Sequence, residues 1–175
     1  VHRLGKFVER ATDVDVVTDL MIHDIDIVLS LVQSELKYVS AVGASIVTNH
    51  VDIANARLEF ENGAIANVTA SRVSAKRFRR IRVFADACYL ALNFEDQQIE
   101  ISRPGKRPAD GGFAPIINSS IQVEPTPPLD SELAHFVDCV REGKQPMVTG
   151  SDGLQALKVA YDVREKIEKS LHSLV

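Results

Sequence analysis

The hydrophobic positions between residues 15 and 30 recur with the period of an α-helix and cover most of its circumference. The polar side chains fall within a narrow stripe, because successive helical residues are turned by about 100°. A helix that is apolar over most of its surface is largely buried, so its polar stripe must face a ligand, a partner or a wet cleft. The stripe consists of Asp15, Asp19, His23, Asp26 and Ser30.

After this helix the pattern changes to alternating hydrophobic and polar positions rich in β-branched residues, which is typical of strands. Short turn signals such as Glu61-Asn62-Gly63 separate them. Five or six sequential strands without helices between them predict an antiparallel meander. The expected strands span residues 37–48, 52–60, 64–72, 78–85, 88–94 and 97–102.

Residues 103–128 are rich in proline and glycine and predict a loop with one short strand at residues 121–124. Two amphipathic helices close the chain, the first ending at Gly143 and the second starting near Ser151 or Asp152. Their expected buried positions are Leu133, Phe136, Val137 and Val140 in the first helix, and Leu154, Leu157, Ala160, Tyr161, Ile167 and Leu171 in the second.

The order of helix, strands, loop and two helices indicates one α+β domain over residues 1–175. We expect a largely antiparallel, open-faced sheet with helices packed on one face. The composition offers little to cover the other face, so that face is expected to meet a second copy in a homodimer or homotetramer.

The composition is ordinary for a water-soluble protein, with 45% hydrophobic residues and a formal net charge of −4. The acidic balance argues against nucleic acid as a partner, and no apolar run approaches the roughly 18 residues of a membrane span. Cys88 and Cys139 lack CxxC spacing and lie in apolar surroundings, which suits free thiols in a reducing cytoplasm. The start VHRLGKFVER has no signal peptide and no initiator Met, so we expect a fragment of a longer protein.

Asp19 and His23 form the strongest candidate site, because residues four apart share one helical face. The carboxylate could orient the imidazole and stabilise its protonated form, and the pair could exchange a proton with a substrate hydroxyl. A structural ion pair or a core histidine is the alternative, and spacing alone favours it.

A hydrolase is disfavoured because the sequence places no Ser or Cys nucleophile. A metal site with Asp26 lacks a second His or Cys, so no metal ligand is expected.

A basic cluster between residues 72 and 82 is the second candidate. It is either a solvated edge strand protected by charge, or a site where Arg72 or Arg77 captures a substrate carboxylate or phosphate. Arg10, just before the first helix, could bind substrate in the same way. The chain has no G-x-G-x-x-G and no Walker A motif, so no cofactor-binding residue of the dinucleotide type is expected within it.

The run DVVTDLMIHDIDIVLSLV resembles the D-x-x-x-H-x-ID helix that opens the C-terminal domain of Gfo/Idh/MocA-type oxidoreductases. ANARLEFENGAIANVTASR is similar to the second and third strands of that domain, and IRVFADACYLAL to its next hairpin. Residues 128–167 resemble its two closing helices. The resemblance covers nearly the whole chain in order, and it implies an open-faced α+β fold of the dihydrodipicolinate-reductase-like type.

The resemblance implies an NAD(P)-dependent dehydrogenase that acts on a sugar, inositol or nucleotide sugar. NAD or NADP would be bound by an N-terminal Rossmann domain that also supplies a lysine from a Glu-Lys-Pro motif, and both lie outside this chain. His23 would relay a proton beside the oxidised carbinol, and Asp19 would orient it or contact the substrate. The fragment alone would then bind no cofactor and be inactive.

Two details refine this resemblance. Thr12-Asp13-Val14-Asp15 stands where the family commonly has a Gly-Gly-Gly run. The segment around DLMIHDID is similar to that of the UDP-N-acetylglucosamine 3-dehydrogenase subgroup.

A non-catalytic module that binds a ligand or dimerises is the alternative function, because a shared fold does not establish a shared reaction.

Overall fold

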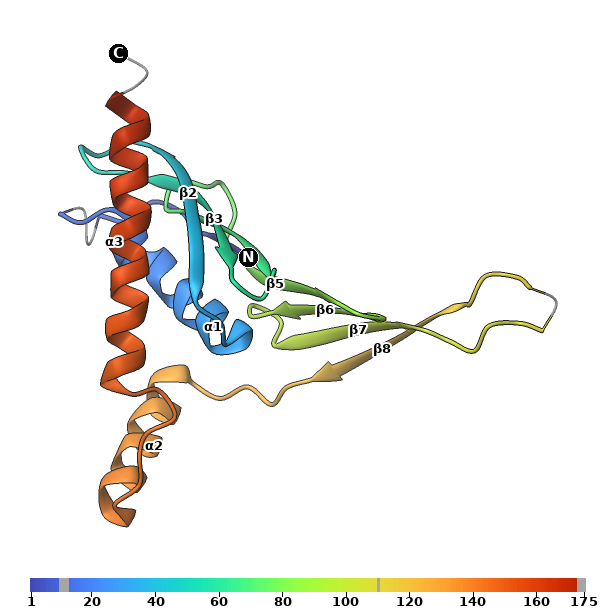
Figure 1. Ribbon diagram of the computed structural model, residues 1–175. Coiled ribbons are helices and arrows are strands. Elements are labelled where there is room, and N and C mark those ends of the chain that lie inside the picture. The colour runs from blue at the N-terminus through green and yellow to red at the C-terminus, as the bar shows by residue number, and fades with distance from the viewer. Residues whose placement is uncertain (10–12, 110, 173–175) are drawn as a thin grey trace. The chain divides into compact units, whose positions relative to one another are not determined.

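The computed structural model describes residues 1–9, 13–109 and 111–172, which contain eight strands, three α-helices and one π-helical turn (Figure 1). The chain divides into two compact units, one made of residues 1–78 and 136–175 and the other of residues 79–135. None of the described helices is both long enough and apolar enough to cross a bilayer. The elements are β1 (His2–Leu4), η1 (Val17–Met21), α1 (Ile22–Val32), β2 (Leu36–Ala44), β3 (Ile53–Phe60), β4 (Ile65–Ser71), β5 (Phe78–Ala85), β6 (Cys88–Asn93), β7 (Gln98–Pro104), β8 (Ile116–Gln122), α2 (Pro128–Glu142) and α3 (Gly150–His172).

The strands of the first unit follow the order β2-β3-β4-β1. β2, β3 and β4 pair antiparallel, whereas β1 joins β4 in parallel with Arg3 opposite Ala70. In the β3–β4 turn Gly63 takes a φ of 83°, and the Asn62 side chain accepts a hydrogen bond from the Ala64 N–H at 3.0 Å. Asn and Gly suit such a turn because one bonds its own backbone and the other tolerates positive φ. The hairpin expected from the sequence is therefore confirmed.

Helices α1 and α3 cover one face of this four-stranded sheet. α3 runs beside β2 and packs on α1 (Figure 1). Gly43 permits the close approach, because an added Cβ would lie 2.7 Å from Val51 Cγ1 and 3.0 Å from Ile167 Cγ2. The alternate β3 residues Leu58 and Phe60 are buried beneath the helices, as the period-2 pattern predicted.

The opposite face of these strands is open within the described residues of the unit. Asn55 and Arg57 of β3 are exposed on it, and Asn55 Oδ1 accepts a hydrogen bond from the Thr69 hydroxyl at 2.8 Å. Val42 of β2 is 53% exposed. A shallow groove of about 300 Å³ crosses this face. The open-faced, largely antiparallel α+β fold expected from the sequence is confirmed.

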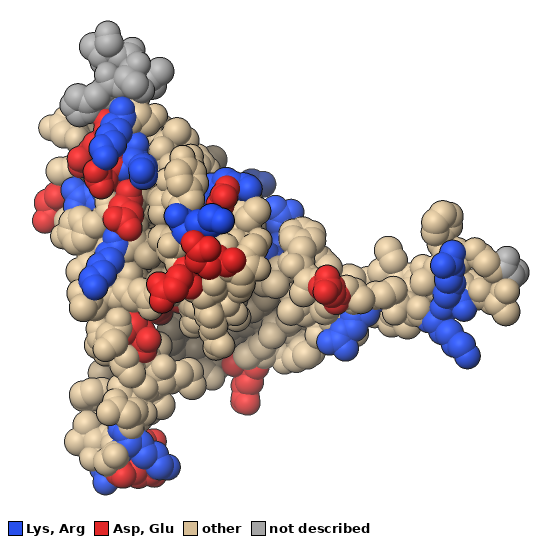
Figure 2. Space-filling model, viewed as in Figure 1, with Lys and Arg blue, Asp and Glu red and all other residues tan. Residues whose placement is uncertain are grey.

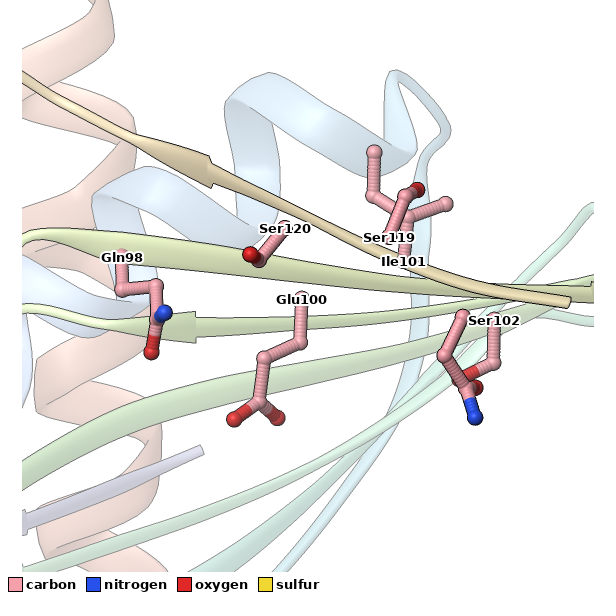
Figure 3. Close-up of a pocket in the computed structure, with 7 residues that line it drawn as sticks. Gln98, Glu100, Ile101, Ser102, Ser119 and Ser120 are labelled. Carbon is pink, nitrogen blue, oxygen red and sulfur yellow. The ribbon is translucent and has the colours of Figure 1, made fainter.

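The second unit is an antiparallel array in the order β5-β6-β7-β8. In β7, Gln98, Glu100 and Ser102 project to one side of the strand while Ile101 projects to the other (Figure 3). Cys88 in β6 is a free thiol, as is Cys139 in α2.

Several strand limits differ from the expectation. The sequence pattern missed β1, whose three residues are too few to show a period. β8 begins at Ile116 rather than at residue 121. β2 ends at Ala44 instead of residue 48, because the backbone N–H groups of residues 46–48 bind the Asp52 carboxylate and leave the ladder.

The expected buried positions are wrong for the first closing helix and partly right for the second, where Ala160 and Ile167 are buried as expected. In α3, Leu154 and Tyr161 are 53% and 54% exposed, whereas the small side chains Ala156 and Ala160 are buried. Small residues face the sheet because they allow the helix to approach β2 closely. In α2 the four expected core residues are all exposed and only Cys139 is buried.

Candidate functional site

The helix that carries the candidate dyad begins with a π turn. The Ile22 N–H donates to the Val17 carbonyl five residues earlier. The Asp15 carboxylate accepts hydrogen bonds from the N–H groups of Val17 and Thr18, both at 2.9 Å, which satisfies donors at the helix start. Single π turns within helices are rare and recur at functional sites. The irregularity thus lies immediately before His23.

Asp19 lies inside the π turn and His23 in the first turn of α1. The Asp19 side chain is half-buried and that of His23 is exposed. Within the described residues neither side chain makes a hydrogen bond or an ion pair, so no direct bond joins them. Their catalytic roles stay a prediction, and the exposed His23 side chain is open to a ligand.

Asp24, the residue after His23, is fully buried. Arg3 of β1 holds it with two bonds, from Nε to Oδ2 at 2.6 Å and from Nη2 to Oδ1 at 2.9 Å. The sequence pattern gave no sign of this pair, because Arg3 and Asp24 belong to elements 21 residues apart and β1 is too short to predict.

Asp15 belongs to the predicted polar stripe, yet it is only 7% exposed. Its Oδ2 lies 2.8 Å from Nε of Arg164 in α3, and this ion pair ties the start of η1 to the C-terminal helix. A groove of about 210 Å³ lies beside the pair and is lined also by Asn49 and His50. Asp15 is therefore a structural residue of the stripe.

Asp26 and Ser30, further along the stripe, line a second groove of about 350 Å³. Gln33, the residue after α1, and Asp152 and Gln155 of α3 complete its polar lining. The pKa of Asp152 is lowered by hydrogen bonds from the hydroxyl and then the backbone N–H of Thr149. The last two residues of the stripe, Asp26 and Ser30, thus line a hollow with a partly polar wall.

Arg72 is buried and held inside the first unit. Its Nε lies 3.4 Å from Asp52 Oδ1, and its Nη2 donates to the carbonyls of Val14 and Val51. These contacts stabilise the loop between β2 and β3. Binding of substrate by Arg72 stays a prediction, and the contacts seen here are structural.

Asp52 is the most strongly perturbed acid of the described chain. Burial alone would raise its pKa, but hydrogen bonds from the backbone N–H groups of Thr48, Ile46 and Val47 and from the Thr48 hydroxyl together hold the pKa far below its ordinary value. The carboxylate is therefore charged at neutral pH and organises the loop around it.

The remaining basic candidates are spread apart. Arg10 lies outside the described residues. Arg77 is exposed, Arg79 stacks 4.1 Å from the centre of the Phe94 ring, and Arg80 pairs with Glu100. Lys, Arg, Asp and Glu side chains also intermingle along α3 on the face seen in Figure 2. Along α3 this view shows no patch of a single charge that would attract a polyanion.

A separate polar groove of about 360 Å³ lies in the second unit, between β7 and β8. Gln98, Glu100 and Ser120 are among its lining residues (Figure 3). These residues carry no motif that would mark a site from the sequence, although the alternation along β7 is visible there. Among the described residues, no group of three or more His, Cys, Asp and Glu side chains is arranged to hold a metal ion.

Comparison with known proteins adds independent evidence. Residues 2–90 match the sequence profile of the family described as the GFO/IDH/MocA C-terminal domain. The chain is 32% identical over 170 residues to UDP-N-acetylglucosamine 3-dehydrogenase of Acidithiobacillus ferrooxidans, an alignment that covers 97% of this chain and 54% of that protein. It is 32% identical over 150 residues to scyllo-inositol 2-dehydrogenase (NAD(+)) of Bacillus subtilis, covering 81% and 42%. The chain thus spans about half the length of these curated relatives.

Solved structures agree with this result. A structure of the UDP-N-acetylglucosamine 3-dehydrogenase from Acidithiobacillus ferrooxidans matches with a TM-score of 0.87 and 32% identity, over 96% of this chain and 53% of that one. Levoglucosan dehydrogenase in complex with NADH and levoglucosan matches with a TM-score of 0.76 over 97% of this chain and 56% of that one. At 18% identity, the second match shows a shared fold alone.

Proposed function

This chain belongs to the GFO/IDH/MocA C-terminal domain family, and from that premise we propose that it is the substrate-binding and oligomerisation domain of an NAD(P)-dependent dehydrogenase. The proposed reaction is oxidation of a hydroxyl of a sugar or nucleotide sugar. The observation that carries the proposal is the exposed His23 with Asp19 one turn before it, on a helix that opens with a π turn. The names of two relatives that are each 32% identical support the substrate class.

The residues of this chain do not fit a dinucleotide cofactor. A dinucleotide site needs a strand, a glycine-rich turn and a helix in a parallel βαβ unit. The pairings within the two units are antiparallel except for β1 with β4, and no glycine-rich turn opens a described helix. The nicotinamide cofactor, which accepts the hydride in such reactions, would therefore be held by a part of the protein outside this chain.

The contribution of this chain to the reaction is proton handling and substrate placement. We propose that the imidazole of His23 accepts the proton of the substrate hydroxyl as the carbinol is oxidised, and returns it in the reverse direction. Asp19, on the same face, would favour the imidazolium that forms, or would bind a neighbouring hydroxyl. Arg10 and Arg72 are the proposed anion-binding residues, and Arg72 also pairs with Asp52.

The test is a dehydrogenase assay of the full-length protein with NAD and NADP. Substrates would include UDP-N-acetylglucosamine, other nucleotide sugars, free hexoses and inositols, and NAD(P)H formation would be followed. We expect turnover of at least one of them by the full-length protein and none by the isolated 175-residue chain. A full-length protein that binds these ligands without turnover would instead support a non-catalytic binding module.

His23→Ala in the full-length protein should lower kcat by about 10²- to 10⁴-fold, the usual contribution of a general acid or base. His50→Gln is the matched control, because His50 is another exposed histidine of the same unit and is assigned no role in the reaction. We expect the control to keep kcat within twofold. A loss of less than about tenfold in His23→Ala would remove this residue from the mechanism.

A further inference from the structure

His23 and Asp24 are adjacent, yet the first is exposed and the second has no exposed surface. Arg3 donates two hydrogen bonds to the Asp24 carboxylate, from Nε at 2.6 Å and from Nη2 at 2.9 Å. A bidentate guanidinium–carboxylate pair fixes an angle as well as a distance, because both groups are planar. The pair therefore joins β1 to the first turn of α1 through a contact of defined angle.

Arg3 is itself fixed by the sheet. It stands opposite Ala70 in the parallel β1–β4 ladder. The Thr69 N–H donates to the Val1 carbonyl at 2.9 Å, and the Gly5 N–H donates to the Ser71 carbonyl at 2.8 Å. The guanidinium thus projects from a backbone that is hydrogen-bonded on both sides of it.

The position of the pair along the helix matters. Consecutive helical residues point about 100° apart, so an inward Asp24 directs His23 away from the core. The preceding turn has i→i+5 geometry, a rare departure from the regular helix that recurs at functional sites. A buried ion pair adds little net stability compared with a well-packed apolar pair, so stability alone does not account for a charged pair here.

We propose that Arg3 and Asp24 are positioning residues for His23. They fix the rotation of the helix about its axis where η1 meets α1. The imidazole of His23 then points toward the proposed substrate. This inference rests on the proposed function, because it assigns the orientation of His23 to proton transfer at the substrate.

The test uses the full-length protein with ¹³C-labelled histidine, and the His23 ring signal is identified by its loss in His23→Gln. Asp24→Asn should lower kcat at least tenfold while KM for sugar and cofactor stays within twofold, and it should broaden or split the His23 signal. The charge-free pair Arg3→Met/Asp24→Leu restores apolar packing if the single variant fails to fold. We expect this double variant to fold, to have a kcat at least tenfold lower than the wild type, and to show a broadened or split His23 signal.

Val163→Ala is the control for a purely structural effect, because Val163 is fully buried in α3 and makes no part of the pair. It should lower stability but leave the His23 signal and kcat within twofold. The inference is overturned if the charge-free pair keeps wild-type kcat and ring signal, or if Val163→Ala reproduces both losses. If the full-length protein turns over no substrate, the proposed function fails, while the ring signal still decides the positioning role.

Discussion

The half-buried Asp19 is the residue whose role a single substitution can resolve. Asp19→Asn keeps the shape of the side chain and removes its charge. If the carboxylate stabilises the imidazolium of His23, kcat of the full-length protein should fall by about 10- to 100-fold with KM for the sugar unchanged. If it binds a substrate hydroxyl instead, steady-state kinetics should show a raised KM. Kinetic constants that both stay within twofold would exclude either role.

Asp52 gives a second prediction, on stability. Its pKa in the folded state lies below the ordinary value near 4, so its contribution to the free energy of unfolding is fully present above about pH 4 and is lost as pH falls through the folded-state pKa. Asp52→Asn should cost about 2–3 kcal/mol at pH 7 and flatten the acid limb of the stability curve. Urea unfolding at several pH values measures this.

The control for that measurement is Asp13→Asn, a change at an exposed carboxylate. It should leave both the stability at neutral pH and the acid limb unchanged. If the stability of Asp52→Asn falls with pH below pH 4 as steeply as that of the wild type, the hydrogen bonds to the Asp52 carboxylate do not control the acid stability of the chain.

The candidate helix could be located from sequence, but the separate environments of its acids could not. The periodic pattern placed Asp15, Asp19, His23 and Asp26 on one stripe. The structure shows that Asp15 is buried beside Arg164 and that Asp24, outside the stripe, is buried beside Arg3. Those differences depend on partners from β1 and α3, and local periodicity carries no information on such distant contacts.

At the level of elements, the contact of α3 with β2 makes a matched pair of predictions. Gly43→Ala should destabilise the protein by about 1–3 kcal/mol, because the new methyl group would meet Val51 and Ile167. Gly153→Ala should stabilise it by about 0.5–1 kcal/mol, because the position is helical and nothing lies within 4 Å of the added atom. Thermal unfolding of both variants measures the two effects, and equal signs would contradict the packing described for α3.

The strands were more predictable than the helix faces, and the reason is physical. A strand with one buried side repeats every two residues, and β5 spans the expected residues 78–85. Which face of α3 is buried depends on which side chains are small enough to approach the sheet. The face with Ala156 is therefore buried, and the face with the larger Leu154 is exposed. The parallel strand β1 depends wholly on β4 and has no signal of its own.

At the level of the whole molecule, the open face of the first unit is the surface proposed for assembly. It carries exposed aliphatic and polar side chains in regular rows, with Val42, Asn55 and Thr69 in one row. A homodimer interface with two-fold symmetry presents the same patch on both copies, so each substitution acts twice. A charge placed on that row would face its own counterpart in the partner.

Val42→Lys in the full-length protein is therefore expected to weaken self-association at least tenfold without unfolding the sheet, because Val42 is 53% exposed and lysine is tolerated on such positions. Asp162→Asn changes the net charge by the same amount at an exposed position of α3 and should leave association unchanged. Sedimentation equilibrium over a range of concentrations, with circular dichroism to check folding, measures both variants.

A wild-type protein that stays monomeric, or a Val42→Lys variant that assembles like the wild type, would show that this face does not mediate assembly. If the protein is a tetramer and Val42→Lys leaves a stable dimer, the open face supplies one of two interfaces, as dihedral symmetry requires.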